Sequence, residues 1–136
     1  MRQALTAGTL PAPRFRYSPV VRVGDLWQTA GLIALDPVTG VLEPGGPGAE
    51  TAKILANLTG ALPELGLSLD DLVIARIYTT RFDAFAEINA AWEAVFDSAT
   101  APPARTSLGV SALPLGATVE MEFTFRKAAD VKAPQP

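Results

Sequence analysis

The chain has 136 residues and a net charge of −3, and its 49% hydrophobic and 18% charged residues are the balance of one globular domain. It contains no histidine and no cysteine, which excludes disulfides, thiolate nucleophiles, iron–sulfur clusters, His-bound zinc and a Ser-His-Asp triad. Any hydrolytic chemistry must therefore use carboxylates, hydroxyls, Arg, Lys, backbone groups or bound water. We therefore expect that the protein uses neither a metal ion nor an organic cofactor.

The N-terminal segment, residues 1–16, has no apolar run of the length found in a secretory signal, and no stretch approaches the roughly 20 apolar residues of a membrane span. The predicted location is the cytoplasm, with no membrane partner. The isoelectric point of about 4.8 argues against nucleic acid as a partner. Arg14, Arg16 and Arg22 give only a weak local excess of positive charge.

The first predicted element is a β-hairpin. Two short apolar runs, Tyr17 to Val23 and Leu26 to Ala30, flank the pair Gly24-Asp25. The segment Asp36 to Gly40 has the residues of a tight turn, and the Pro- and Gly-rich stretch from Glu43 to Gly48 is expected to be a loop.

A helix and a strand follow the loop. From Glu50 the apolar spacing becomes helical, and Gly66 supplies the stop signal. Because Pro63 disfavours a helix interior by about 3 kcal/mol, the last turn is expected to bend or to stop early. A capped single turn over Ser68 to Asp71 then leads into a strand over Leu72 to Thr80.

The last third of the chain predicts one helix and two strands. Asp83 is the expected N-cap of the helix, which carries an apolar stripe. After the break at Pro102-Pro103, a strand is expected over Ala104 to Val110. The clearest strand covers Thr118 to Phe125, where apolar and polar residues alternate. Residues 127–136 form a tail that lacks apolar anchors and is expected to be loose.

The predicted order of elements is ββαβαββ. This order favours the α+β class, with a mixed sheet packed by two helices on one face, because that arrangement buries both helical stripes. A single domain is expected over residues 1–136, with its core over residues 17–126.

Four residues are candidates for chemistry on their own pattern. Arg105 follows the Pro-Pro-Ala break at the mouth of a strand, where a guanidinium can bind a carboxylate through two parallel hydrogen bonds or can pair with a surface acid. Glu120 and Glu122 share the polar face of an apolar strand, where they either divide acid and base roles or form an ordinary solvated surface. Tyr17 opens the first strand and either donates its hydroxyl to a ligand or packs at a rim. None of these residues alone indicates a function.

A series of short motifs spans nearly the whole chain, from Tyr17 to Phe125. These motifs are Tyr17-Ser18-Pro19, Gly24-Asp25-Leu26, Thr29-Ala30-Gly31, Asp36-Pro37-Val38-Thr39-Gly40, Asn57-Leu58, Leu69-Asp70-Asp71-Leu72-Val73, Asp83-Ala84-Phe85, Asn89, Pro102-Pro103-Ala104-Arg105-Thr106, Leu113-Pro114 and Val119-Glu120-Met121-Glu122. In this order and spacing the chain resembles the YjgF/RidA family. The segment around Arg105 and the segment around Glu120 are the most specific parts of the resemblance.

The resemblance implies a chorismate-mutase-like α+β fold and a homotrimer with clefts between subunits. It also implies hydrolysis of reactive 2-imino acids, or of 2-aminoacrylate enamine tautomers, to 2-oxo acids and ammonia. By resemblance, Arg105 binds the carboxylate of a small substrate and Glu120 positions or activates water. The residues that the resemblance further assigns to substrate binding are Tyr17, Ala30, Asn89 and the backbones of Gly31 and Ser107. A protonated imine is already an electrophile, so this chemistry needs neither a metal nor a covalent nucleophile.

The chain departs from the family pattern at Ala30-Gly31-Leu32, where deaminating members usually have Ser-Gly-Gln. A hydroxyl and an amide expected near the substrate are therefore absent. Three alternatives to small imino acids stay open. One is a non-catalytic trimer that binds small carboxylates. Another is a deaminase for a bulkier imine, whose pocket Ala30 and Leu32 would widen or make more apolar. The third is a ribonuclease, against which the acidic charge and the absence of histidine argue.

Overall fold

The computed structural model describes residues 1–98 and 101–128 of the chain. The strands are β1 (Gln3–Leu5), β2 (Val20–Val23), β3 (Leu26–Thr29), β4 (Leu72–Thr79), β5 (Ala104–Gly109) and β6 (Val119–Arg126). The helices are α1 (Pro47–Leu65) and α2 (Phe85–Val95), with the one-turn helices η1 (Leu69–Asp71), η2 (Phe82–Ala84) and η3 (Pro114–Gly116).

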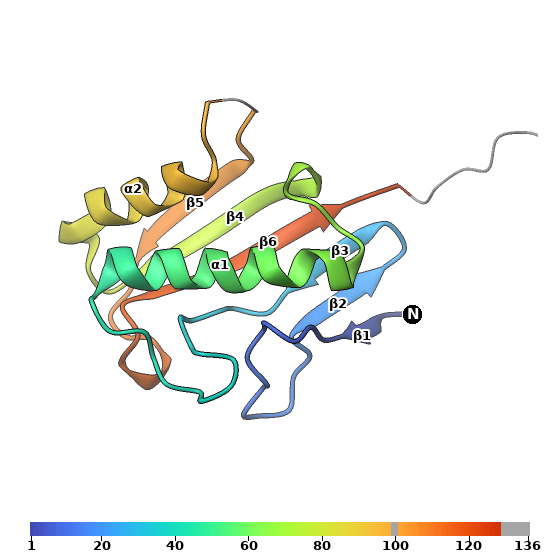
Figure 1. Cartoon of the computed structure of the whole chain (residues 1–136), viewed down its shortest axis with the longest axis horizontal. Coiled ribbons are helices and arrows are strands. Elements are labelled where there is room, and N and C mark those ends of the chain that lie inside the picture. Colours follow the sequence, from blue (N-terminus) through green and yellow to red (C-terminus); the bar gives the residue numbers. More distant parts are fainter. Residues whose placement is uncertain (99–100, 129–136) are drawn as a thin grey trace, which may run out of the picture.

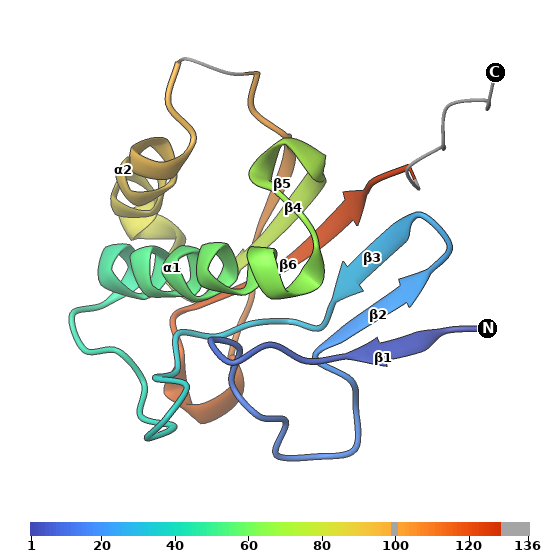
Figure 2. The same ribbon diagram turned by 45° about the vertical axis from the view of Figure 1, so that its right-hand side comes forward.

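The strands form one six-stranded sheet in the order β1-β2-β3-β6-β4-β5. β4 and β5 run parallel, whereas the other neighbours pair antiparallel. Both helices lie on one face of the sheet, as Figure 1 and Figure 2 show. We call this face the inner face and the opposite one the outer face. The predicted α+β class, with a mixed sheet and two helices on one side, is confirmed.

The N-terminal segment adds a strand that the sequence did not predict. β1 pairs antiparallel with β2, with Ala4 opposite Val21. Farther along the same segment, Ala7 and Leu10 are buried in the main core. Because β1 has only three residues and no apolar alternation, its pattern carries no strand signal. The observed order is therefore the predicted ββαβαββ with one strand added in front.

Helix α1 begins earlier than its pattern predicted and runs to the predicted stop at Gly66. It begins at Pro47 rather than Glu50, since proline has no N–H to leave unpaired in the first turn. It also continues through Pro63, so the predicted early stop is wrong. Pro63 is tolerated because it is exposed and lies in the last turn. Gly66 then ends the helix in the left-handed region at φ 72°, as predicted.

Asp83 does not cap α2, and this prediction is also wrong. The residue at the N-cap position is Ala84, which follows the one-turn helix η2. The Asp83 carboxylate instead accepts two hydrogen bonds from Arg81, each of 3.0 Å. A bidentate guanidinium contact two residues away outcompetes the backbone N–H groups for the same oxygens.

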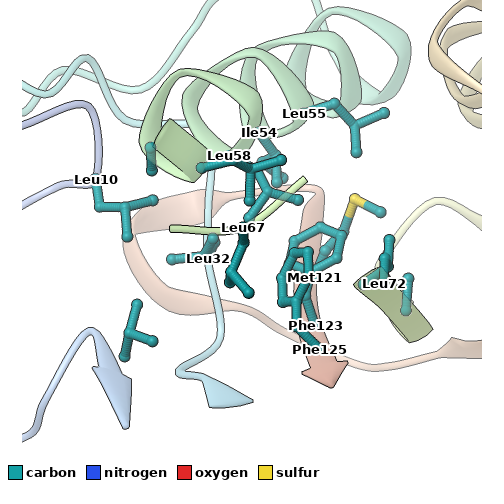
Figure 3. Close-up of a cluster of buried hydrophobic side chains, with 14 of the residues drawn as sticks. Leu10, Leu32, Ile54, Leu55, Leu58, Leu67, Leu72, Met121, Phe123 and Phe125 are labelled. Carbon is teal, nitrogen blue, oxygen red and sulfur yellow. The ribbon is translucent and has the colours of Figure 1, made fainter. Parts of the chain in front are cut away.

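β6 has the alternation that the sequence predicted. Val119, Met121, Phe123 and Phe125 are fully buried on the inner face. Figure 3 shows the last three beneath side chains of α1 such as Ile54. The intervening polar residues point to the outer face, where no helix of the described chain covers them. This alternation decides on which side of the sheet each candidate residue lies.

Two further expectations concern the ends of the chain. The predicted loose tail falls almost wholly on residues 129–136, which lie outside the described residues. Among the described residues, no helix has the length and apolar character needed to cross a membrane.

Candidate active site

A cleft of about 870 Å³ opens on the outer face near the start of β6, and we call it the Glu120 cleft. Its walls come from the loop 11–19, the segment 30–35 and the loop 110–115, which lie far apart in the sequence. Tyr78, Glu120 and Glu122 contribute side chains from β4 and β6. Of the residues that the sequence assigned to the site, Tyr17, Ala30 and Gly31 also border this cleft.

The Glu120 carboxylate packs directly against the backbone of Gly31. A Cβ atom at position 31 would lie 2.8 Å from the carboxyl carbon and 3.0 Å from Oε1 of Glu120. A side chain at position 31 would therefore have to displace the flexible end of Glu120, although glycine is not needed here for an unusual backbone angle. Burial, and then the nearby Glu122 carboxylate, raise the pKa of Glu120 above its usual value. Such a carboxylate is a stronger base than a freely solvated one.

The segment that carries Gly31 is fixed on both sides by backbone hydrogen bonds. The N–H of Ala30 donates to the carbonyl of Pro19 at 2.9 Å, and Leu32 exchanges two bonds with Met121 at 2.7 and 2.9 Å. Residue 31 is thereby held beside the strand that carries Glu120. Leu32 itself is only 7% exposed and packs in the core, as Figure 3 shows. Leu32 also borders the Glu120 cleft, where it adds apolar lining.

Glu50 is a buried carboxylate that sequence reasoning did not single out. It is 2% exposed in the first turn of α1 and accepts hydrogen bonds from the backbone N–H and the hydroxyl of Thr118. The N–H distance is 2.9 Å, and Val119 adds a longer bond of 3.4 Å. These contacts fix the start of β6, two residues before Glu120. An acidic residue in a first helical turn is a common capping pattern, so this role of Glu50 could not be predicted from its position in the chain.

Tyr78 and Glu122 form a second polar contact in the cleft. The tyrosine hydroxyl donates to Oε1 of Glu122 at 2.7 Å, and this bond is the main reason why the pKa of Tyr78 is raised. Arg76 lies 3.9 Å from the same carboxylate. Glu122 is thus engaged by its neighbours, whereas Glu120 has no hydrogen bond from another side chain of the described residues. Glu120 is the carboxylate left available to water or to a ligand.

Arg105 lies on the other side of the sheet. It pairs in register with Ala75, which is fully buried on the inner face. Its guanidinium carbon lies 5.4 Å from the ring centre of Phe85 and 5.2 Å from that of Trp92, both on α2. Among the described residues it makes no hydrogen bond or ion pair. Its N–H donors are therefore uncommitted, although the side chain is held in place.

The remaining two candidates lie near Arg105 rather than near Glu120. Ser107 is two residues further along β5 and faces the same side, in register with Ile77. Asn89 lies between Phe85 and Trp92 at helical spacings of four and three, so it shares their side of α2. Neither residue borders the Glu120 cleft.

The candidate residues thus form two groups on opposite faces of one sheet. The Glu120 group consists of Tyr17, Ala30, Gly31 and Glu120. The Arg105 group consists of Asn89, Arg105 and Ser107. The first group offers a half-buried base beside a cavity, and the second offers an exposed cation with free hydrogen-bond donors.

Comparison with known proteins assigns the chain to a family. The family model described as Endoribonuclease L-PSP matches residues 7–126. A RutC family protein of Aquifex aeolicus is 36% identical over 117 residues, which covers 86% of this chain and 93% of that protein. The 2-iminobutanoate/2-iminopropanoate deaminase of Bos taurus is 30% identical over 122 residues, covering 90% and 88% respectively. The crystal structure of RidA from the Antarctic bacterium Psychrobacter sp. matches with a TM-score of 0.83 at 30% identity, covering 92% and 99%.

The chain therefore belongs to the YjgF/RidA family, as its motifs predicted. The names borne by its relatives include both endoribonuclease and imine deaminase. Membership alone does not choose between these activities, and the choice has to come from the site.

Proposed function

We propose that the protein hydrolyses reactive 2-imino acids, or their 2-aminoacrylate-type enamine tautomers, to 2-oxo acids and ammonia. Arg105 binds the substrate carboxylate and Glu120 positions and activates the attacking water. The observation that carries the proposal is the Glu120 carboxylate, half-buried against Gly31 with a raised pKa and facing an open cleft. The imine deaminase name of the bovine relative supports the same reaction class.

The reaction needs only one acid–base group, because a protonated imine is already electrophilic at C2. Glu120 accepts a proton from water as the water oxygen bonds to C2 and the C=N bond becomes single. Glu120 then returns that proton to the nitrogen of the resulting carbinolamine, and the C–N bond breaks as ammonia leaves. The hydroxyl group becomes the carbonyl of the 2-oxo acid and gives its proton, through Glu120, to the departing ammonia, which becomes ammonium. One water is consumed, and no oxidant or cofactor takes part.

The complete site requires a second copy of the chain in this proposal. Arg105 and Glu120 face opposite sides of the sheet, with β4 between their strands. One small substrate cannot reach both in a single chain. We assign the Arg105 group to one subunit and the Glu120 group to its neighbour in a homotrimer, where a closed ring of identical contacts gives three equal clefts. The uncovered outer face supplies surface for this contact.

The test is the decay of 2-iminopropanoate, generated in situ by an amino-acid oxidase. The wild type is expected to accelerate decay, and Arg105→Ala is expected to leave it near the spontaneous rate. Arg126→Ala removes an arginine whose ion pair with Asp25 is exposed, and serves as the matched control with unchanged activity. If the wild type does not exceed spontaneous hydrolysis, the proposal is wrong for small imino acids.

The same preparation separates the other candidate functions. Saturable binding of 2-oxobutanoate without acceleration would indicate a non-catalytic carboxylate binder. Cleavage of single-stranded RNA that persists in Glu120→Gln and Arg105→Ala would indicate a ribonuclease with different residues. We expect the RNA to remain intact, since the chain has a net charge of −3 and contains no histidine.

The cytoplasm remains the predicted location of the protein.

A bulkier imine is the second candidate substrate, and the walls of the cleft favour it. Phe15, Leu113 and Leu115 line the cavity, and Ala30 leaves room where a hydroxyl would stand in related deaminases. Imino acids made by the oxidase from leucine and phenylalanine provide the comparison with that from alanine. A higher kcat/KM for the larger pair would select this alternative, and a lower one would select small substrates.

A further inference from the structure

The surroundings of Arg105 are aromatic rather than acidic. Its guanidinium carbon lies 5.4 and 5.2 Å from the ring centres of Phe85 and Trp92, within the ~6 Å at which a cation is attracted to a ring face. We call these two rings the aromatic cradle. Both come from α2 at a spacing of seven residues, so two turns of one helix present them to the same side chain.

An aromatic partner leaves the N–H donors of the Arg105 guanidinium free, whereas an acidic partner does not. A carboxylate partner would take up the N–H donors of the guanidinium, whereas a ring attracts the cation without accepting those hydrogen bonds. Arg105 makes no hydrogen bond or ion pair among the described residues. The cradle therefore restrains the side chain while its donors remain available for a planar carboxylate.

The cradle is itself braced on both sides. Phe82 stacks on Phe85 with ring centres 4.8 Å apart, and Phe96 packs on Trp92 at 4.2 Å. Trp92 also belongs to the buried core of the domain. A guanidinium resting on such rings loses little further freedom when a ligand arrives. This preorganisation reduces the entropic cost of binding.

We propose that Phe85 and Trp92 are positioning residues that hold Arg105 ready for the substrate carboxylate. The proposal rests on the proposed function, because it assumes that Arg105 binds that carboxylate. Since the carboxylate is bound in both the ground state and the transition state, the cradle acts on substrate affinity and hardly on the chemical step. Loss of the cradle is therefore expected to raise KM and to leave kcat nearly unchanged.

The kinetic test uses Phe85→Leu, which keeps an apolar side chain and removes the ring. We expect a KM about fivefold higher for 2-iminopropanoate, with kcat within about twofold of the wild type. Phe85→Tyr restores a ring and is expected to restore KM. Val95→Ala removes packing from the same helix at a residue that lines a separate cavity with Leu69 and Pro102, and it controls for general loosening of α2. If Phe85→Leu and Val95→Ala raise KM equally, the positioning role is refuted.

A second test follows Trp92 directly and does not depend on turnover. The chain has two tryptophans, so Trp27→Phe leaves Trp92 as the single fluorescent reporter. Titration of this variant with 2-oxobutanoate is expected to give a saturable change in the emission of Trp92. The reason is that the ligand carboxylate binds the Arg105 guanidinium, which lies over the Trp92 ring. Adding Phe85→Leu should raise the dissociation constant about fivefold. An unchanged dissociation constant would overturn the proposal.

The two tests also distinguish failure of the cradle from failure of the proposed function. If Arg105→Ala binds 2-oxobutanoate as well as the Trp27→Phe parent, Arg105 is not the carboxylate ligand and the proposed function fails with it. If Arg105→Ala loses binding but Phe85→Leu does not weaken it, only the positioning role is wrong.

Discussion

The carboxyl carbon of Glu120 lies so close to Gly31 that a Cβ atom added there would come within 2.8 Å of it. Two segments distant in sequence thus meet with only a hydrogen atom between them. The position of the proposed base is set by this contact and by the Glu50 contacts at the start of β6. Both contacts can be changed without touching the reacting group itself.

Gly31→Ala is expected to displace the Glu120 carboxylate and to lower kcat by about 100-fold, the effect of misplacing a reacting group by about 1 Å. The fold should survive, because Gly31 is exposed. Gly8→Ala is the matched control, since Gly8 is also exposed and its new Cβ would meet only the flexible end of Glu64 at 3.3 Å. Wild-type kcat in Gly31→Ala would show that Glu120 does not act from this position.

The acidic limb of the pH–rate profile should report the raised pKa of Glu120. The base works only when ionised, so kcat/KM falls as the pH drops through a pKa that lies above 4.5. Glu122→Gln removes the like charge that contributes to this shift, and the limb should move to lower pH. It should not return fully to the usual value, because burial is the larger cause. A limb that stays in place would exclude Glu120 as the titrating group.

The same shift predicts a gain in stability when the charge is removed. A carboxyl whose pKa is higher in the folded chain than in the unfolded chain favours folding at low pH, and this contribution is lost as the pH rises through the folded-state pKa. At neutral pH, Glu120→Gln should therefore unfold at a higher denaturant concentration than the wild type. At a pH well below 4.5 the difference should vanish. A less stable Glu120→Gln at neutral pH would contradict the cause assigned to the shift.

Glu50→Ala should destabilise the fold by about 1 to 3 kcal/mol, because it leaves the part-buried backbone N–H of Thr118 without its acceptor. Denaturant unfolding measures this loss. Glu93→Ala, an exposed change on α2, should stay within about 0.5 kcal/mol of the wild type. Equal effects of the two substitutions would mean that Glu50 does not anchor β6.

A shared site makes two inactive variants complementary. Arg105→Ala lacks the residue that binds the substrate carboxylate, and Glu120→Gln lacks the base, so each variant alone should be inactive. When equal amounts are refolded together, chains mix, and about one quarter of the clefts should receive an intact residue from each neighbour. Recovered activity near that fraction supports a site between subunits. No recovery, in a mixture shown to contain mixed oligomers, would place both residues in the same chain's site.

The sequence predicted most of the sheet and both helices, because their signals are local. The alternation in β6 and the apolar stripes of α1 and α2 can be read within one element. The predictions at Pro63 and Asp83 were wrong because each rested on a local preference alone. Pro63 is accommodated in the exposed last turn of α1, and the Asp83 carboxylate accepts hydrogen bonds from Arg81 instead of capping α2.

The site was harder to predict because it depends on pairing between distant strands. The motifs singled out Arg105 and Glu120, but nothing in their spacing shows that they face opposite sides of the sheet. That fact follows from the register of Ala75 with Arg105 and of Tyr78 with Glu120. The role of Glu50 was hidden for the same reason, since its partner Thr118 lies 68 residues away.

The placement of the two groups on opposite faces of the sheet also affects how the activity depends on the amount of protein. If each cleft is completed by a neighbouring subunit, a folded single chain is inactive. The activity per chain then falls when the protein is diluted below the concentration at which the subunits separate. Freshly synthesised chains would then become active at a rate that depends on how often they meet. The level of expression would then act as a threshold for activity, without any effector or modification.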